Sequence, residues 1–107
     1  MNLNPIAPYS EEFHEANHLM RAYAATERVD LYGLMCQSRK NAYLFSIHED
    51  DTLCGCVCLF PYQSALSAIC LLKKLCFADQ KHQDNLLAAL KEKFPQHQIY
   101  LSINIYE

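Results

Sequence analysis

The spacing of apolar residues changes from a helical to an alternating period near residue 42, and this change divides the chain into two kinds of element. Between Ser10 and Cys36 the apolar positions recur every three or four residues, which predicts amphipathic helices. The first helix follows an N-cap at Ser10 and ends near Ala25, and the second runs from Glu27 to Cys36. The buried stripe predicted for the first helix is Phe13, Ala16, Met20, Tyr23 and Ala24.

Alternation with a period of two begins at Ala42 and predicts strands. Residues 42–48 and 53–60 form a predicted β-hairpin around an acidic turn, and residues 68–77 form the next strand. A helix with leucines on one side then ends at Pro95, and Ile99–Ile105 is the last strand. With a first strand at residues 4–9, the order is β-α-α-β-β-β-α-β. We therefore expect a single α+β domain over residues 1–107, with helices packed on a mixed sheet.

Length and charge narrow the classes of partner. A chain of 107 residues has room for one modest core, and its net charge of −3 offers no basic field for nucleic acid. The longest run of basic residues is Lys73-Lys74. The sequence shows no signal peptide and no apolar run of membrane-spanning length, so we expect a cytoplasmic protein with no membrane partner.

Six cysteines sit within apolar runs, and three of them alternate along one predicted strand. Strand geometry would turn Cys54, Cys56 and Cys58 to the same face, at a spacing of roughly 6.5–7 Å that does not suit tetrahedral zinc. Buried free cysteine behaves as a small apolar residue. We therefore expect the cysteines to pack in the core without a metal, and a metal or redox site is the alternative that the pattern leaves open.

Three segments carry a family resemblance: Ile6–Glu12, Leu53–Leu59 with Gly55, and Lys73–Phe77 followed by a helix. In this order of elements they resemble the GNAT superfamily of acyl-CoA-dependent N-acyltransferases. The resemblance implies that acyl-CoA, such as acetyl-CoA, binds along splayed fourth and fifth strands, with its pantetheine arm on the fourth strand and its pyrophosphate at the following loop and helix. The cofactor-binding residues implied in this way are Leu75, Cys76, Phe77, Lys81, His82 and Asn85.

The chain departs from the family at the pyrophosphate loop, where the family has small residues and this sequence has Asn85 and Leu87. Their side chains would obstruct close approach of a diphosphate to the backbone. Asp79 and Asp84 add negative charge that opposes a bound anion. Either aspartate could cap the helix: a start at Asp84 leaves a loop able to wrap an anion, and a start at Asp79 turns that loop into helix.

No catalytic residue can be carried over by motif. The family's base is often an acid on or near the fourth strand, but the segment Cys70–Phe77 contains none. The family continues beyond its fifth strand into a helix that often carries a tyrosine general acid, whereas the printed sequence reaches Glu107 directly after the last predicted strand. We expect Tyr100 and Tyr106 to be structural residues, and His48 and His97 to lie at the surface.

The segment His14–His18 satisfies H-E-x-x-H, the pattern of zinc peptidases, in which two histidines bind zinc and the glutamate between them activates water. Both histidines fall on the side of the predicted helix opposite its apolar stripe. We therefore interpret the segment as a solvated helix face; adventitious metal binding and a peptidase are the alternatives.

Two functions remain. The first is a non-catalytic interaction or regulatory module on a GNAT-like scaffold, with at most weak cofactor binding. An apolar sheet edge at Ile99–Ile105 then predicts a homodimer or another protein partner. The alternative is an acyl-CoA-dependent N-acetyltransferase that acts on an unidentified amine.

Overall fold

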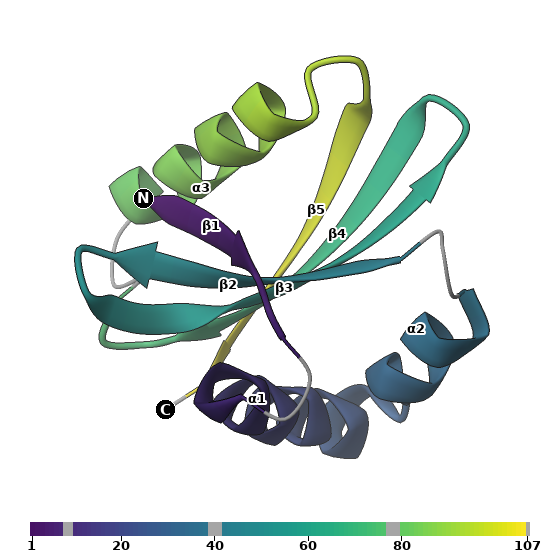
Figure 1. The fold of residues 1–107 in the computed structure, drawn as a ribbon, viewed down its shortest axis with the longest axis vertical. Coiled ribbons are helices and arrows are strands. Elements are labelled where there is room, and N and C mark those ends of the chain that lie inside the picture. Colours follow the sequence, from purple (N-terminus) through teal and green to yellow (C-terminus); the bar gives the residue numbers. More distant parts are fainter. Residues whose placement is uncertain (8–9, 39–41, 77–79, 107) are drawn as a thin grey trace.

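The computed structural model describes residues 1–7, 10–38, 42–76 and 80–106. Figure 1 shows three helices packed around a five-stranded sheet. The elements are β1 (Asn2–Pro5), α1 (Glu11–Glu27), α2 (Leu31–Ser38), β2 (Tyr43–Glu49), β3 (Thr52–Tyr62), β4 (Ala65–Lys73), α3 (Gln80–Lys93) and β5 (Gln98–Tyr106). This confirms the predicted α+β class with a mixed sheet. None of the helices within the described residues has the length and apolarity needed to span a bilayer.

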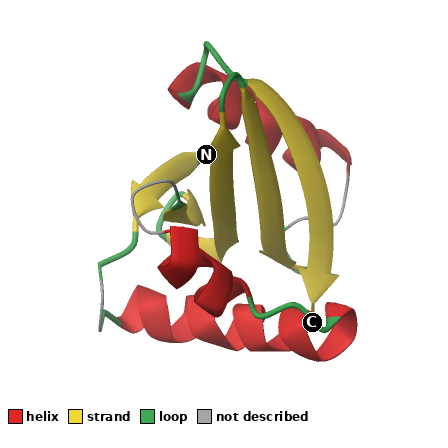
Figure 2. Cartoon of the chain, turned by 90° about the vertical axis from the view of Figure 1, so that its right-hand side faces the viewer, coloured by secondary structure: helices red, strands yellow, loops and turns green. Residues whose placement is uncertain are grey.

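The strands lie in sequence order, β1-β2-β3-β4-β5. Neighbouring strands from β1 to β4 are antiparallel. In contrast, β4 and β5 are parallel, because α3 carries the chain back to the end of the sheet at which β4 begins. In Figure 2, β5 runs beside β4 at the edge of the sheet and ends next to the C-terminus. The two edge strands are therefore the short β1 and the nine-residue β5.

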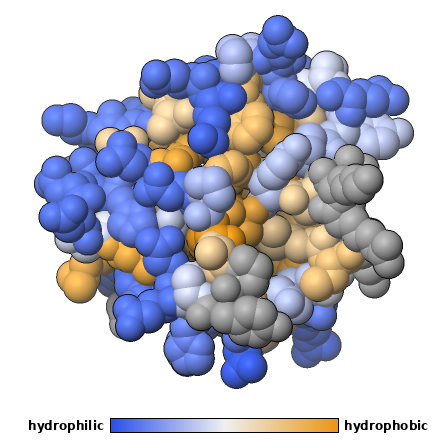
Figure 3. All heavy atoms as spheres, in the orientation of Figure 1, coloured by the Kyte–Doolittle hydropathy of each residue, from blue (hydrophilic) through white to orange (hydrophobic). Residues whose placement is uncertain are grey.

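The helices cover opposite faces of the sheet, with α3 on one side and α1 and α2 on the other (Figure 1). Leu86 and Leu90 of α3 pack on one apolar cluster, and Ala16, Leu19 and Met20 of α1 pack on the other. Hydrophilic side chains cover α3 and α1, and apolar surface emerges between them (Figure 3). Burial of one face of each helix thus holds the three layers together.

The first helix begins where the sequence predicts it. Ser10 Oγ accepts a hydrogen bond from the backbone N–H of Phe13 at 3.1 Å, as an N-cap should. The helix continues to Glu27, two residues beyond the predicted end, and Arg28 closes it in the left-handed conformation. Leu19, absent from the predicted stripe, is buried, whereas Phe13 is only partly buried.

A β-bulge overturns the prediction that Cys54, Cys56 and Cys58 share a face. The register shifts so that His48 pairs with Leu53 and Ile47 pairs with Gly55, which leaves Cys54 as the extra residue. Cys54 therefore joins the cluster beneath α3, while Cys56 and Cys58 join the cluster beneath α1.

Other predicted boundaries move by several residues. The first strand is Asn2–Pro5, and the end of the predicted segment at residues 8–9 lies outside the described residues. The second helix begins at Leu31 instead of Glu27. The strand predicted for residues 68–77 is β4, which begins earlier, at Ala65, and ends at Lys73.

Candidate functional site

The turn that follows β4 contains Leu75 and Cys76, two of the cofactor-binding residues that the family resemblance implies. Leu75 and Cys76 lie in the turn, not on a strand, and the N–H of Cys76 donates to the carbonyl of Lys73 at 3.0 Å. The side chain of Leu75 is 99% exposed, whereas Cys76 packs against the cluster beneath α3. Phe77 lies outside the described residues. The two described residues of this segment therefore face different surroundings.

The remaining implied residues lie inside a helix. Because α3 begins at Gln80, Lys81 and His82 belong to its first turn and Asn85 to its second. This rules out a helix start at Asp84, whose carboxylate instead accepts a hydrogen bond from the side-chain amide of Gln80 at 3.2 Å. Asp79, the other predicted cap, lies outside the described residues. The segment from residue 80 onward has no loop left to wrap a diphosphate.

The pairing of β4 with β5 is continuous, contrary to the splayed arrangement that the family resemblance implies. The register runs without interruption from the Ala65/Gln98 pair to the Lys73/Tyr106 pair. Beyond its last pair, the N–H of Lys74 donates to the carbonyl of Tyr106 at 2.8 Å. The other edge of β4 is paired with β3. The backbone groups that would bind a pantetheine arm are thus used within the sheet.

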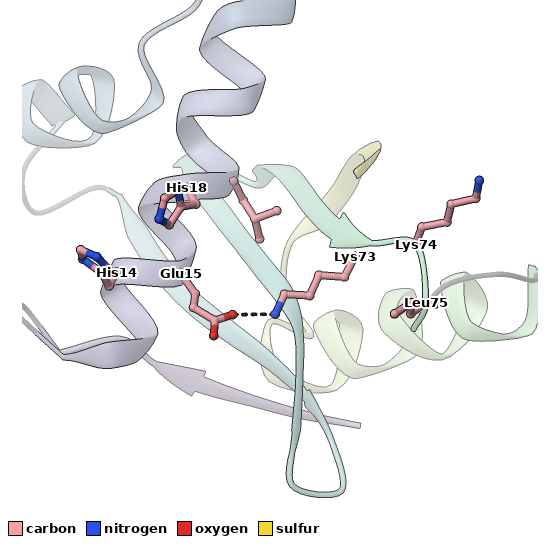
Figure 4. A pocket seen from close by; sticks show the side chains of 7 residues that line it. His14, Glu15, His18, Lys73, Lys74 and Leu75 are labelled. Carbon is pink, nitrogen blue, oxygen red and sulfur yellow. Dashed lines mark hydrogen bonds and ion pairs between the residues drawn. The ribbon is translucent and has the colours of Figure 1, made fainter. Parts of the chain in front are cut away.

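A groove with a volume of about 880 Å³ lies between α1 and the end of β4. Figure 4 shows the seven side chains that line it. They are His14, Glu15, His18, Leu19, Lys73, Lys74 and Leu75. Such a volume suits a small molecule or a side chain of a partner. The sequence singled out the two histidines, Glu15 and Leu75 for separate reasons, and the fold brings them together.

An ion pair crosses this groove. The ammonium group of Lys73 lies 2.5 Å from a carboxylate oxygen of Glu15, and both side chains are partly exposed. Figure 4 shows these two side chains meeting between α1 and β4, while Lys74 extends away from α1. Sequence reasoning missed this pair because its partners are far apart in the chain. Exposed pairs of this kind contribute about 0–1 kcal/mol, so a ligand could displace it at small cost.

The H-E-x-x-H segment does not have the arrangement of a peptidase centre. His14 and His18 are exposed, as predicted, and their rings meet edge to face with centroids 5.6 Å apart. Glu15, which would activate water in a peptidase, is paired with Lys73. Among the described residues there is no group of three side chains able to hold a metal ion. The segment therefore supplies lining side chains to the groove.

A second polar cluster corrects the prediction that His48 lies at the surface. Its Nε2 lies 3.4 Å from a carboxylate oxygen of Glu12, and its Nδ1 lies 3.3 Å from Ser46 Oγ. Ser46 is fully buried and donates to the carbonyl of Asn4 at 3.3 Å. A buried hydroxyl cannot reach a substrate, so this cluster ties α1, β1 and β2 together and is not a nucleophile with its base.

The buried thiols are held in their neutral form. Burial raises the pKa of Cys70 to about 12, and burial together with contact with Cys76 raises the pKa of Cys54 to about 12. Contact with Cys58, followed by burial, raises the pKa of Cys56 well above its usual range. These shifts make the three thiols poor nucleophiles and support the prediction that they pack as apolar residues.

The two tyrosines of β5 lie in different surroundings. Tyr100 is 54% exposed. Burial, and after it the nearby carboxylate of Glu27 and the phenol of Tyr23, raise the pKa of Tyr106. Because Tyr106 packs beside α1 with its backbone bonded to β4, we interpret it as a structural residue.

Comparison with known proteins gives no identification: no family model and no curated protein matches this chain.

Proposed function

We propose that this chain is a non-catalytic interaction module on a GNAT-like scaffold, and that it self-associates through β5. The observation that carries the proposal is the continuous pairing of β4 with β5 from Ala65/Gln98 to Lys73/Tyr106. An acyl-CoA thioester needs free backbone groups along this seam, and here they are occupied by the sheet itself. The helical start at Gln80 further supports a scaffold that does not wrap a diphosphate.

The outer edge of β5 supports the interaction role. The segment Gln98–Tyr106 contains no charged residue, no proline and no register shift along its pairing with β4. Proteins usually protect an edge strand with lysine, proline, a bulge or short length. The opposite edge, β1, has such protection, since it is four residues long and ends at Pro5. The chain therefore offers one long strand whose outer groups suit another strand.

The occupant that this edge fits best is a second copy. Two β5 strands related by a two-fold axis would pair antiparallel, and neither brings a charge that would repel the other. Tyr100 and Ile105, exposed by 54% and 41%, would gain contacts with the partner. A mass that stays at 12.3 kDa in light scattering at high protein concentration would contradict this pairing.

The alternative, an acyl-CoA-dependent N-acetyltransferase, is favoured by the order of elements and by the parallel β4/β5 pair. Titration calorimetry with acetyl-CoA separates the two functions. We expect no saturable heat at high micromolar ligand. Stoichiometric binding that weakens in the Lys81→Ala, His82→Ala double variant, but not in Lys91→Ala on the same helix, would place a diphosphate at the start of α3 and favour the enzyme.

A further inference from the structure

The β-bulge in β3 brings one cysteine to an unexpected position. Cys54 is the unpaired residue between Leu53 and Gly55, and its side chain is turned to the face of the sheet covered by α3. Without the bulge it would lie on the other face with Cys56 and Cys58. Its side chain is buried, with 1% exposed, and its thiol donates to the carbonyl of Thr52 at 3.7 Å.

A second cysteine meets it there from another part of the chain. Cys76 lies in the turn after β4 and packs against the same apolar cluster as Cys54. The thiol of Cys76 is a neighbour of the Cys54 thiol and helps to raise its pKa. Both are free in the structure, and Cys76 is partly exposed whereas Cys54 is buried. The thiol of Cys76 is therefore accessible to solvent, and the buried thiol of Cys54 lies beside it.

We propose that Cys54 and Cys76 are a redox pair, which a hydroperoxide converts into a reversible intramolecular disulfide. The proposal goes beyond the interaction function and does not depend on it. An accessible cysteine beside a second one that can resolve its oxidised form is the arrangement of a thiol redox sensor. Three of the other cysteines, Cys56, Cys58 and Cys70, are buried and so lack the accessibility of Cys76.

The chemistry takes two steps. The thiolate of Cys76 attacks one oxygen of hydrogen peroxide, the O–O bond breaks, and a sulfenic acid forms as hydroxide leaves and takes up the proton lost by the thiol. The sulfur of Cys54 then attacks the sulfur of that sulfenic acid. A sulfur–sulfur bond forms, and the hydroxyl group leaves as water with the proton of the Cys54 thiol. Peroxide is reduced to two waters, and two thiols are oxidised to one disulfide.

The order of the two residues follows from their surroundings. Burial holds Cys54 in the neutral form, with its pKa raised to about 12, and a neutral thiol is a poor attacker of peroxide. Cys76 is therefore the residue that is oxidised first. Cys54 is the resolving thiol, and its position beside Cys76 offsets its low reactivity, because the two sulfurs do not have to meet by diffusion. The resulting disulfide would tie the turn at residues 74–76 to the β2/β3 hairpin. Because Lys74 and Leu75 line the groove beside α1, oxidation would fix one rim of that groove.

The test is peroxide oxidation of the whole chain, followed by alkylation of the remaining thiols and non-reducing peptide mapping by mass spectrometry. We expect a cross-link between the peptides that contain Cys54 and Cys76, with the mass of two hydrogens lost and full reversal by dithiothreitol. In Cys54→Ser, the cross-link should be absent and Cys76 should accumulate as a sulfenic acid that dimedone traps. In Cys36→Ser, the matched control at an exposed position, the cross-link should form as in the unmodified chain.

Two results would overturn the proposal. One is oxidation confined to Cys36, with Cys54 and Cys76 both recovered as alkylated thiols after excess peroxide. The other is a disulfide that joins a different pair and persists in Cys76→Ser. Because Cys76 lies in a turn, Cys76→Ser should fold even if Cys54→Ser does not, and loss of the intramolecular cross-link in that variant alone would support the pair.

Discussion

The backbone N–H of Lys74 donates to the carbonyl of Tyr106 at 2.8 Å, one residue beyond the last pair of β4 and β5. This bond closes the seam between the two parallel strands at the end that faces the turn and α3. A sheet that is paired to its end gives a ligand no backbone groups to bind along that seam. The closed seam is therefore the feature on which we base the proposal of a non-catalytic module.

Gly55 lies on β3 against the backbone of β4. A Cβ at this position would lie 2.3 Å from the carbonyl oxygen of Leu71, a backbone atom that cannot move without disturbing the sheet. We expect Gly55→Ala to lower the free energy of unfolding by about 3 kcal/mol, measured by urea denaturation.

The matched control is Gly33→Ala in α2. There the nearest atom to an added Cβ is a carboxylate oxygen of Asp30 at 2.5 Å, at the end of a side chain that can rotate. The better helix propensity of alanine offsets part of the displaced hydrogen bond between Asp30 and the Gly33 N–H, so the change should stay within about 1 kcal/mol. Equal losses in the two variants would show that the contact with Leu71 is not the cause.

The buried cysteines predict a loss of stability at alkaline pH. The pKa values of Cys54 and Cys70 are raised from 9.0 to about 12 in the folded chain. A group with a raised pKa contributes stability that is fully present below its unfolded value and is lost as the pH rises through the folded value. The free energy of unfolding should therefore fall by a few kcal/mol between pH 9 and pH 12.

Cys70→Ala should make this fall shallower, since it removes one of the three buried thiols whose pKa is raised, whereas Cys36→Ala at an exposed position should leave it unchanged. Equilibrium denaturation in a pH series measures both. A free energy of unfolding that is flat across this interval in the unmodified chain would contradict the burial of these thiols.

The ion pair across the groove predicts a small effect on stability. Glu15 and Lys73 are both partly exposed, so water screens their attraction. We expect Glu15→Gln to change the free energy of unfolding by less than about 1 kcal/mol in thermal or chemical denaturation. A double-mutant cycle with Lys73→Met would give the coupling directly, and a coupling above about 2 kcal/mol would show that the pair is less hydrated than its exposure indicates.

Local patterns allowed the elements to be predicted, and long-range contacts account for what was missed. The N-cap at Ser10 and the helical period of α1 depend on neighbours within a few residues, so they are readable from sequence. The bulge at Cys54 depends on the register against β2, and the pairing of His48 with Glu12 joins residues from different elements. Sequence spacing alone carries no information on either.

The candidate site likewise combines features that the local sequence predicts with features that depend on long-range contacts. The apolar run Leu75–Phe77 resembles a continued strand, but the chain leaves the sheet at Lys73, where the last strand pair forms with Tyr106. The two histidines of α1 were correctly placed on an exposed face. That they share a groove with Lys73 and Leu75 follows from how α1 crosses the sheet, which only the tertiary structure reveals.

We propose the outer edge of β5 as an interface between copies of this chain. Light scattering coupled to size exclusion tests it directly, with three proteins compared at the same high concentration. The unmodified chain should give twice its monomer mass of 12.3 kDa. Ser102→Lys, which places a charge at the middle of β5, should give a monomer with an unchanged circular dichroism spectrum.

Ser67→Lys is the matched control, because Ser67 is exposed on the same face of the sheet but lies on β4, next to Tyr100 and away from the edge. This variant should remain a dimer. The expected masses are therefore those of a dimer, a monomer and a dimer, in that order. A monomer in all three proteins, or a dimer that Ser102→Lys leaves intact, would contradict the claim that β5 is the interface.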